Sequence, residues 1–228
     1  MGSKSMQSCK YFIAKTFAHT AAGIGIAAAS AEYPVLYKAL LKQVRSRNLT
    51  SLIIFIAAIA LIFVLPWIAP NTPLKYLAAT AFVYLMGQLS GPLVQALDER
   101  NILARTLFLA TGVFVGMVLV GLYDSNNLLG IGPYLFGALL GLIVAQFILF
   151  ILEATNAVKK EQYFQGVKIL SFFGVGLFSL FAAYDTQIVK VRARACKKQG
   201  DYIDESMALF LDFTNLFQYI GVAGLSDD

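Results

Sequence analysis

The sequence predicts an all-α integral membrane protein, built as a seven-helix bundle. Of its 228 residues, 58% are hydrophobic, and the mean hydropathy is +0.70. Charged residues make up 14%, whereas a soluble domain carries about 25%. The apolar residues also form blocks of roughly 20 residues, the length that crosses a bilayer. At this chain length we expect one bundle and not two domains.

We predict a polar N-terminal segment at 1–15, a single transmembrane domain at 16–222 and a short acidic tail at 223–228. A seventh helix, beginning near Asp201 and ending near Gly221, is more polar than the others, and it either spans the membrane or re-enters only partway. The six preceding apolar blocks are expected at 17–31, 51–69, 74–97, 105–123, 128–152 and 166–189.

The first block has alternative explanations. It could be a signal peptide with Ala29-Ser30-Ala31 as its cleavage site, or a mitochondrial presequence. His19 and Gly23 suit a packed helix better than a signal core, and a presequence would hold more arginines. The acceptor pattern Asn48-Leu49-Thr50 lies too close to the next span for us to expect glycosylation.

The charge pattern indicates a membrane topology and no nucleic-acid partner. With the N-terminus in the cytosol and alternating spans, nine lysines and arginines fall on each side, so the positive-inside rule is tied. Two features favour this orientation: the densest basic loop, at 190–198, and both Cys9 and Cys196 lie inside. We expect the loop to contact anionic lipid and the cysteines to be reduced.

Glycines recur at GxxxG spacing in three of the blocks, a pattern that lets helices approach closely. We expect a packing role for each pair. The pairs are Gly87 with Gly91, Gly112 with Gly116, and Gly137 with Gly141.

Two aspartates, Asp185 and Asp212, lie inside runs of apolar and aromatic residues. A carboxylate in hydrocarbon costs about 2.5–3.5 kcal/mol on insertion scales, so acids in such positions usually have a function. Glu205, Asp212, Asn215 and Tyr219 fall on one face of the last helix. A hairpin of the last two helices can therefore bring Asp185 and Asp212 face to face.

Two carboxyl groups in one low-dielectric site tend to share a proton. Without the proton they repel each other and offer hard oxygen ligands that suit calcium. We therefore expect Asp185 and Asp212 to form a pH sensor and a transient calcium site, with no resident cofactor. The alternative is structural: each aspartate caps neighbouring backbone or pairs with a loop arginine.

The segments around these aspartates, Tyr184–Gln187 and Leu209–Phe217, resemble the C-terminal signature of the transmembrane Bax inhibitor motif family. The stretch Gly87–Pro92 resembles that family's third-helix pattern. The resemblance covers about residues 12–222. It implies a seven-helix fold with a central, partly re-entrant last helix. It also implies a pH-sensitive calcium leak across an internal or bacterial membrane, with Asp185 and Asp212 as the sensor. The supporting polar positions are Tyr184, Thr186, Gln187 and Asn215.

In eukaryotes the family implies suppression of cell death by lowering stored calcium. The implied partners are the lipid bilayer, calcium ions, protons and cell-death regulators of the Bcl-2 type. Because the sequence shows no long N-terminal domain and no clear presequence, we expect the endoplasmic reticulum or Golgi rather than the mitochondrial inner membrane.

This sequence departs from the family pattern at two places. Some members have an acid three residues after the Gly-Pro pair, where this chain has Gln95, with Asp98 one turn further on. Some also have an arginine in the second helix that holds the carboxyl pair closed. The block 51–69 has no charge, and the nearest arginines, Arg45 and Arg47, precede it. The block 51–69 therefore offers no charged residue that could hold the closed state.

The pair of aspartates and the apolar blocks also allow other functions. An intramembrane aspartyl protease also uses two aspartates that share a proton, but Gly-x-Gly is missing before Asp212 and no proline follows it. His19 has no catalytic motif around it, so we expect a packed or interfacial residue and not an enzyme. A scaffold that binds cell-death regulators predicts that both aspartates are dispensable. A proton-coupled carrier would be supported by internal repeats, and we find none.

Overall fold

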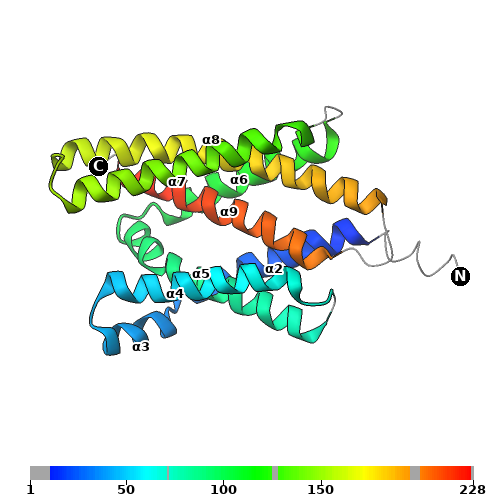
Figure 1. Cartoon of the computed structure of the whole chain (residues 1–228), viewed down its shortest axis with the longest axis horizontal. Helices are drawn as coiled ribbons and strands as arrows, with labels where there is room; N and C mark the ends of the chain where they lie inside the picture. Colours follow the sequence, from blue (N-terminus) through cyan, green and yellow to red (C-terminus); the bar gives the residue numbers. More distant parts are fainter. Residues whose placement is uncertain (1–10, 71, 125–127, 196–200, 227–228) are drawn as a thin grey trace, which may run out of the picture. The chain divides into compact units, whose positions relative to one another are not determined.

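The computed structural model describes residues 11–70, 72–124, 128–195 and 201–226. Within these residues the chain is helical and contains no strand (Figure 1). Seven helices are long and apolar enough to cross a bilayer, which confirms an all-α membrane protein. In chain order the elements are α2 (Phe12–Glu32), α3 (Val35–Val44), α4 (Arg47–Val64), η1 (Leu65–Trp67), α5 (Pro73–Glu99), α6 (Leu103–Tyr123), η2 (Leu128–Ile131), α7 (Gly132–Ala154), α8 (Lys160–Ala195) and α9 (Tyr202–Leu225).

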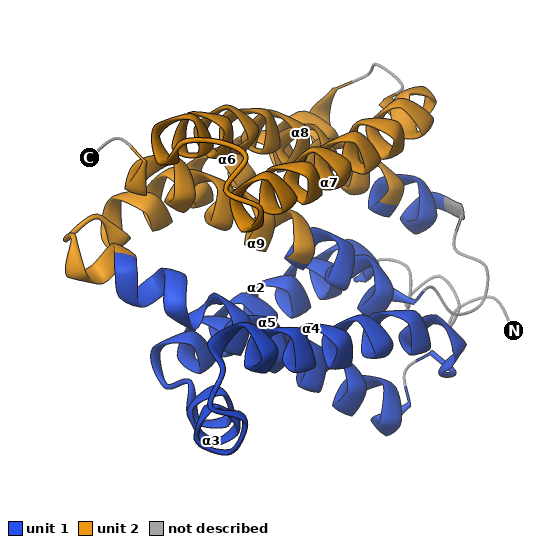
Figure 2. Cartoon of the chain, turned by 60° about the vertical axis from the view of Figure 1, so that its left-hand side comes forward, with its two compact units in different colours: residues 1–96, 189–210 blue, residues 97–188, 211–228 orange. Residues whose placement is uncertain are grey.

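The chain divides into two compact units, coloured separately in Figure 2. Unit 1 comprises residues 1–96 and 189–210, and unit 2 comprises residues 97–188 and 211–228. Unit 1 therefore holds α2, α3, α4 and most of α5, together with the end of α8 and the beginning of α9. Unit 2 holds α6, α7, most of α8 and the remainder of α9.

The helices extend further than the apolar blocks that predicted them. α2 begins at Phe12 and α9 ends at Leu225, so the predicted limits at 16 and 222 fall inside helices. α8 has 36 residues, or about 54 Å at 1.5 Å per residue, against a hydrocarbon core of about 30 Å. It therefore includes parts of the predicted connector 153–165 and of the predicted basic loop. Hydropathy marks the part of a helix that lies in lipid and not its ends.

The predicted connector between the first two spans contains a helix of its own, α3, which has ten residues. It ends at Val44 and is followed by the C-cap residue Arg45, which has a left-handed backbone conformation with φ of 57°. Ser46 then caps α4 by accepting a hydrogen bond from the backbone of Leu49 at 3.4 Å. α4 starts at Arg47, so the second span begins earlier than predicted.

In unit 1, α5 packs closely on α2 through Gly87. A Cβ atom there would lie 2.3 Å from the carbonyl oxygen of Ala27. The neighbouring Gln88 is fully buried and donates to the carbonyl of Ser30 at 2.9 Å and to its hydroxyl at 2.7 Å. α2 is thus an integral part of the fold, which supports a span rather than a cleaved signal peptide.

The three predicted GxxxG pairs do not behave alike. Gly87 lies in the close contact just described, and a Cβ at Gly91 would lie 3.3 Å from the carbonyl of Ala31. At the other two pairs a Cβ atom would meet no described atom within 4 Å, so the packing prediction is wrong for them: Gly112, Gly116, Gly137 and Gly141. Spacing alone does not reveal which face of a helix meets a neighbour.

In unit 2, α6 packs closely on α8 through Gly121. A Cβ atom at this position would lie 2.4 Å from the carbonyl oxygen of Ala183 on α8. Phe114 of α6 and Phe213 of α9 also meet edge to face, with ring centroids 5.6 Å apart. These contacts leave α6, α8 and α9 packed on one another.

α9 is the most buried of the seven spans, with 50% of its most apolar stretch inside the protein. This burial fits the predicted central position of the last helix. Its 24 residues correspond to about 36 Å, which is enough to cross a bilayer. The environment predicted for Cys9 and Cys196 falls outside the described residues.

Candidate functional site

Asp185 of α8 and Asp212 of α9, both in unit 2, have side chains within hydrogen-bonding reach of each other. Asp212 is 4% exposed, and Asp185 is half-buried. A carboxylate can only accept hydrogen bonds, so a bond between two carboxyl groups needs a proton on one of them. The observed arrangement therefore suits one proton held between the two side chains.

One oxygen of the pair is unsatisfied. Asp212 Oδ2 is buried and has no hydrogen-bond partner among the residues that the structure describes. A buried acceptor without a partner costs about 1–3 kcal/mol, so such an atom usually points to a function or to a bound water or ion.

The carboxyl pair belongs to a series of contacts between α8 and α9, spaced seven residues apart on each helix. Arg192 pairs with Glu205 in unit 1, and Asp185 meets Asp212 in unit 2. Also in unit 2, the rings of Phe178 and Tyr219 stack with their centroids 5.6 Å apart. Seven residues are about two helical turns, so Glu205, Asp212 and Tyr219 all use the same face of α9.

The supporting residues Tyr184, Thr186 and Gln187 hold α8 against its neighbours in unit 2. Gln187 accepts a hydrogen bond from the backbone of Leu128 at 2.9 Å. The Tyr184 hydroxyl lies tightly against Gly132 at the start of α7, and Thr186 packs on Gly121 of α6. These contacts position the helix that carries Asp185.

Asn215, the fourth supporting residue, is one turn beyond Asp212 on α9. Its amide donates to the carbonyl of Leu211 at 2.8 Å. Its side chain also lines a cavity between α7, α8 and α9 in unit 2. Asn215 is therefore placed between the carboxyl pair and that cavity along α9.

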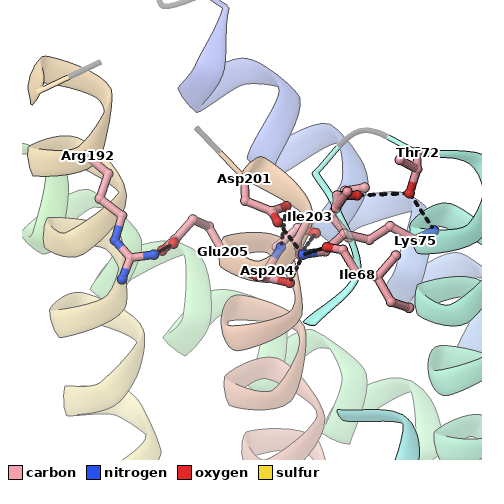
Figure 3. A network of polar contacts seen from close by, with 10 residues as sticks. Ile68, Thr72, Lys75, Arg192, Asp201, Ile203, Asp204 and Glu205 are labelled. Carbon is pink, nitrogen blue, oxygen red and sulfur yellow. Dashed lines mark hydrogen bonds and ion pairs between the residues drawn. The ribbon is translucent and has the colours of Figure 1, made fainter. Parts of the chain in front are cut away.

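Sequence reasoning missed a buried ionic cluster in unit 1, which Figure 3 shows from close by. Lys75 of α5 has a completely buried side chain. It forms ion pairs with Asp201 and with Asp204, the second at 2.8 Å, and donates to the carbonyl of Ile68 at 3.4 Å. From the sequence, Lys75 contributed only to the number of positive charges on one side of the membrane. The available signal was a lone lysine at the start of an apolar block.

His19 lies beside this cluster in unit 1, packed between two tyrosines. Its ring centroid is 5.0 Å from that of Tyr202 and 5.7 Å from that of Tyr76. The two tyrosine hydroxyls are hydrogen-bonded to each other, and the Lys15 ammonium lies 5.3 Å above the Tyr202 ring. His19 is therefore packed against aromatic rings, which is one of the two environments predicted for it. The beginnings of α2, α5 and α9 therefore lie together, as alternating spans require.

The carboxyl pair is not a complete metal site by itself. Within the described ranges, no three His, Cys, Asp or Glu side chains are grouped so as to hold a metal ion. Calcium takes six to eight oxygen ligands, so a calcium ion at Asp185 and Asp212 would need water or carbonyl oxygens for the rest. Such coordination suits a passing ion.

The fold and the site define a multispan α-helical membrane protein with a buried carboxyl pair on its last two helices. Residues 9–222 match the family described as Inhibitor of apoptosis-promoting Bax1. The chain therefore belongs to the Bax inhibitor-like family.

Several bacterial proteins are similar to this chain. An uncharacterized protein of Deinococcus radiodurans is 27% identical, covering 99% of this chain and 94% of that protein. An uncharacterized protein of Helicobacter pylori is 33% identical, covering 75% of this chain and 71% of that protein. The inner membrane protein YbhL of Escherichia coli is 33% identical, covering 50% of this chain and 48% of that protein.

Proposed function

We propose that this protein is a pH-sensitive calcium leak, a transport protein rather than an enzyme, controlled by Asp185 and Asp212. The observation that carries the proposal is the buried contact between these two carboxyl groups in unit 2. Family membership supports it. A structural pair of this kind would be expected to satisfy its buried oxygens, whereas Asp212 Oδ2 has no partner among the described residues.

The chemistry of the pair supplies a switch. With one shared proton, the hydrogen bond between the two side chains links α8 to α9. Without it, two negative charges repel each other and attract a divalent cation. Protons and calcium therefore compete for the same two side chains, and the flux of calcium depends on pH.

The test is calcium entry into proteoliposomes that contain a fluorescent indicator, measured from pH 5 to pH 8. The variants are Asp185→Asn, Asp212→Asn and the double substitution, because asparagine keeps the shape and removes the titration. Asp98→Asn is the control, since Asp98 is an exposed acid at the end of α5. We expect flux to change with pH in the wild type and in the control. Each substitution in the pair should flatten that dependence.

Two results would contradict the proposal. One is the absence of calcium flux in the wild type under all conditions. The other is an identical pH dependence in all variants, which would mean that the pair does not control the flux. A cell-based effect that survives the double substitution would instead favour a scaffold for other membrane proteins.

The finer biological role is part of the proposal. Suppression of cell death by lowering stored calcium and contact with regulators of the Bcl-2 type follow from the family resemblance. Placement in the endoplasmic reticulum or Golgi is the location expected from the sequence. The relatives reported above are bacterial, and one is named an inner membrane protein. A bacterial inner membrane is therefore the alternative location, where the leak would act on calcium entry.

A further inference from the structure

Unit 2 contains a cavity of about 360 Å³ between α7, α8 and α9. At about 30 Å³ for each water in the liquid, it has room for several waters. No lining side chain is charged, but many are polar. The polar lining residues are Gln146, Tyr163, Ser171, Asn215, Gln218 and Tyr219.

Polar groups are unusual in helices as apolar as those that line this cavity. Gln146 belongs to α7, whose apolar stretch has a mean hydropathy of 2.7, among the highest of the seven spans. Polar side chains in such helices normally face the protein interior or a water-filled space. Gln146 donates its amide to the hydroxyl of Tyr219 at 2.7 Å, and both residues line the cavity. The lining therefore supplies the hydrogen-bonding groups that a water molecule inside the cavity would need.

The cavity and the carboxyl pair follow each other along the same two helices. Asn215 comes three residues after Asp212 on α9, and Tyr219 comes seven after it, so all three share one face. On α8, Phe178 comes seven residues before Asp185 and stacks on Tyr219. The stacked rings are therefore about two turns, or 10 Å, from the carboxyl pair along the helices.

Tyr219 is fixed at this place by α8. Its ring is tilted only 20° from that of Phe178. It also lies directly against Gly174, where an added Cβ atom would be 2.6 Å from the ring. Only glycine leaves space for the ring here. The ring of Tyr219 thus forms a fixed part of the cavity wall, about two turns from Asp212 along α9, with its hydroxyl bonded to Gln146.

We propose that this cavity is an aqueous vestibule for a hydrated cation, narrowed by the ring of Tyr219. Neutral amide and hydroxyl oxygens suit this task because they hold a hard cation weakly enough to release it. Passage of the cation from the cavity to Asp212 rests on the proposed calcium leak, whereas the presence of water in the cavity does not.

The first test measures water access with cysteines. In a Cys9→Ser, Cys196→Ser background, Asn215→Cys and Gln218→Cys are exposed in proteoliposomes to a membrane-impermeant, charged thiol reagent. The controls are Leu216→Cys, at a fully buried position, and Phe147→Cys, beside Gln146 on α7. We expect modification at 215 and 218 and none at 216 and 147. Unreactive cysteines at both 215 and 218 would show a dry packing defect and overturn the proposal.

The second test measures the narrowing of the cavity by Tyr219. Tyr219→Ala removes the ring and should raise calcium flux by roughly two- to tenfold, the equivalent of one lost aromatic pair. Phe150→Ala is the matched control, because Phe150 lines the same cavity but has no stacking partner of this kind among the described rings. Equal flux in the two variants would exclude narrowing by Tyr219.

The two proposals fail in different ways. If cysteines at 215 and 218 react while flux ignores Asp185 and Asp212, the vestibule is supported and the carboxyl switch is refuted. If the cysteines do not react, but Asp185→Asn and Asp212→Asn flatten the pH dependence of calcium flux, only the vestibule is refuted.

Discussion

The ammonium group of Lys75, in the first turn of α5, forms a buried ion pair with the carboxylate of Asp201, which directly precedes α9 (Figure 3). Asp204 and the carbonyl of Ile68 provide two further acceptors. Lysine has three donors, so each one has a partner. A buried cation is tolerated only when it is paired in this way. The cluster thus joins two chain segments 126 residues apart.

Replacing Lys75 by methionine should therefore destabilise the protein. The change leaves Asp201 and Asp204 close together without a cation, and removing one partner of a buried pair costs about 3–5 kcal/mol. Because the two carboxylates are 17% and 30% exposed, we expect a loss near the lower end. Thermal unfolding in detergent micelles measures it. Lys38→Met is the control, since Lys38 is exposed on α3.

A compensating change tests the cause. Asp201→Asn together with Asp204→Asn should recover part of the stability lost in Lys75→Met, because neutral amides no longer repel. The same changes in the wild type should destabilise, and the difference gives the coupling free energy. Equal unfolding temperatures for Lys75→Met and Lys38→Met would mean that the cluster does not stabilise the fold.

Gly121 and Gly116 of α6 provide a matched pair of substitutions. Gly121→Ala places a methyl group 2.4 Å from the carbonyl oxygen of Ala183, so α6 must move away from α8. Overpacking of this kind costs about 1–3 kcal/mol. Gly116→Ala meets no described atom and should be neutral or stabilising by about 0.5–1 kcal/mol, since alanine favours helix.

The comparison of these two variants is made by thermal unfolding in the same detergent. The displacement of α8 in Gly121→Ala should also alter the pH dependence of calcium flux, because Ala183 lies two residues from Asp185. If both variants unfold at the same temperature, the close contact between α6 and α8 is absent in the membrane protein.

Gln88 and Gln95 of α5 form a second matched pair. Gln88→Leu removes two hydrogen bonds to Ser30 and one from the backbone of Tyr37, and it leaves buried polar groups without partners. Each such group costs about 1–3 kcal/mol. Gln95 is exposed on the same helix, so Gln95→Leu should change stability by less than about 0.5 kcal/mol. Similar unfolding temperatures for the two would refute the role of Gln88.

Some features of this protein could be predicted because they are local. The seven spans follow from the length and composition of each apolar block. Asp185 and Asp212 attract attention because a carboxylate in such a block is costly wherever the helices go. The face shared by Glu205, Asp212 and Tyr219 follows from helical period, and each of these residues does contact α8.

Other features could not be predicted because they depend on which faces meet. Lys75 and Gln88 look like ordinary residues near an apolar block, and their partners lie 126 and 58 residues away. The three GxxxG pairs are alike in sequence, but only Gly87 and Gly91 oppose another helix closely. The cavity beside Asn215 appears only when three helices are placed side by side.

The sequence by itself thus determined the class of protein, the number of spans and the two acids, because the bilayer imposes a length and a polarity on every helix separately. The tertiary structure decided which charges are neutralised, which glycines are essential and where polar groups enclose a space. These properties belong to pairs and triples of helices, and no single segment contains the information that specifies them.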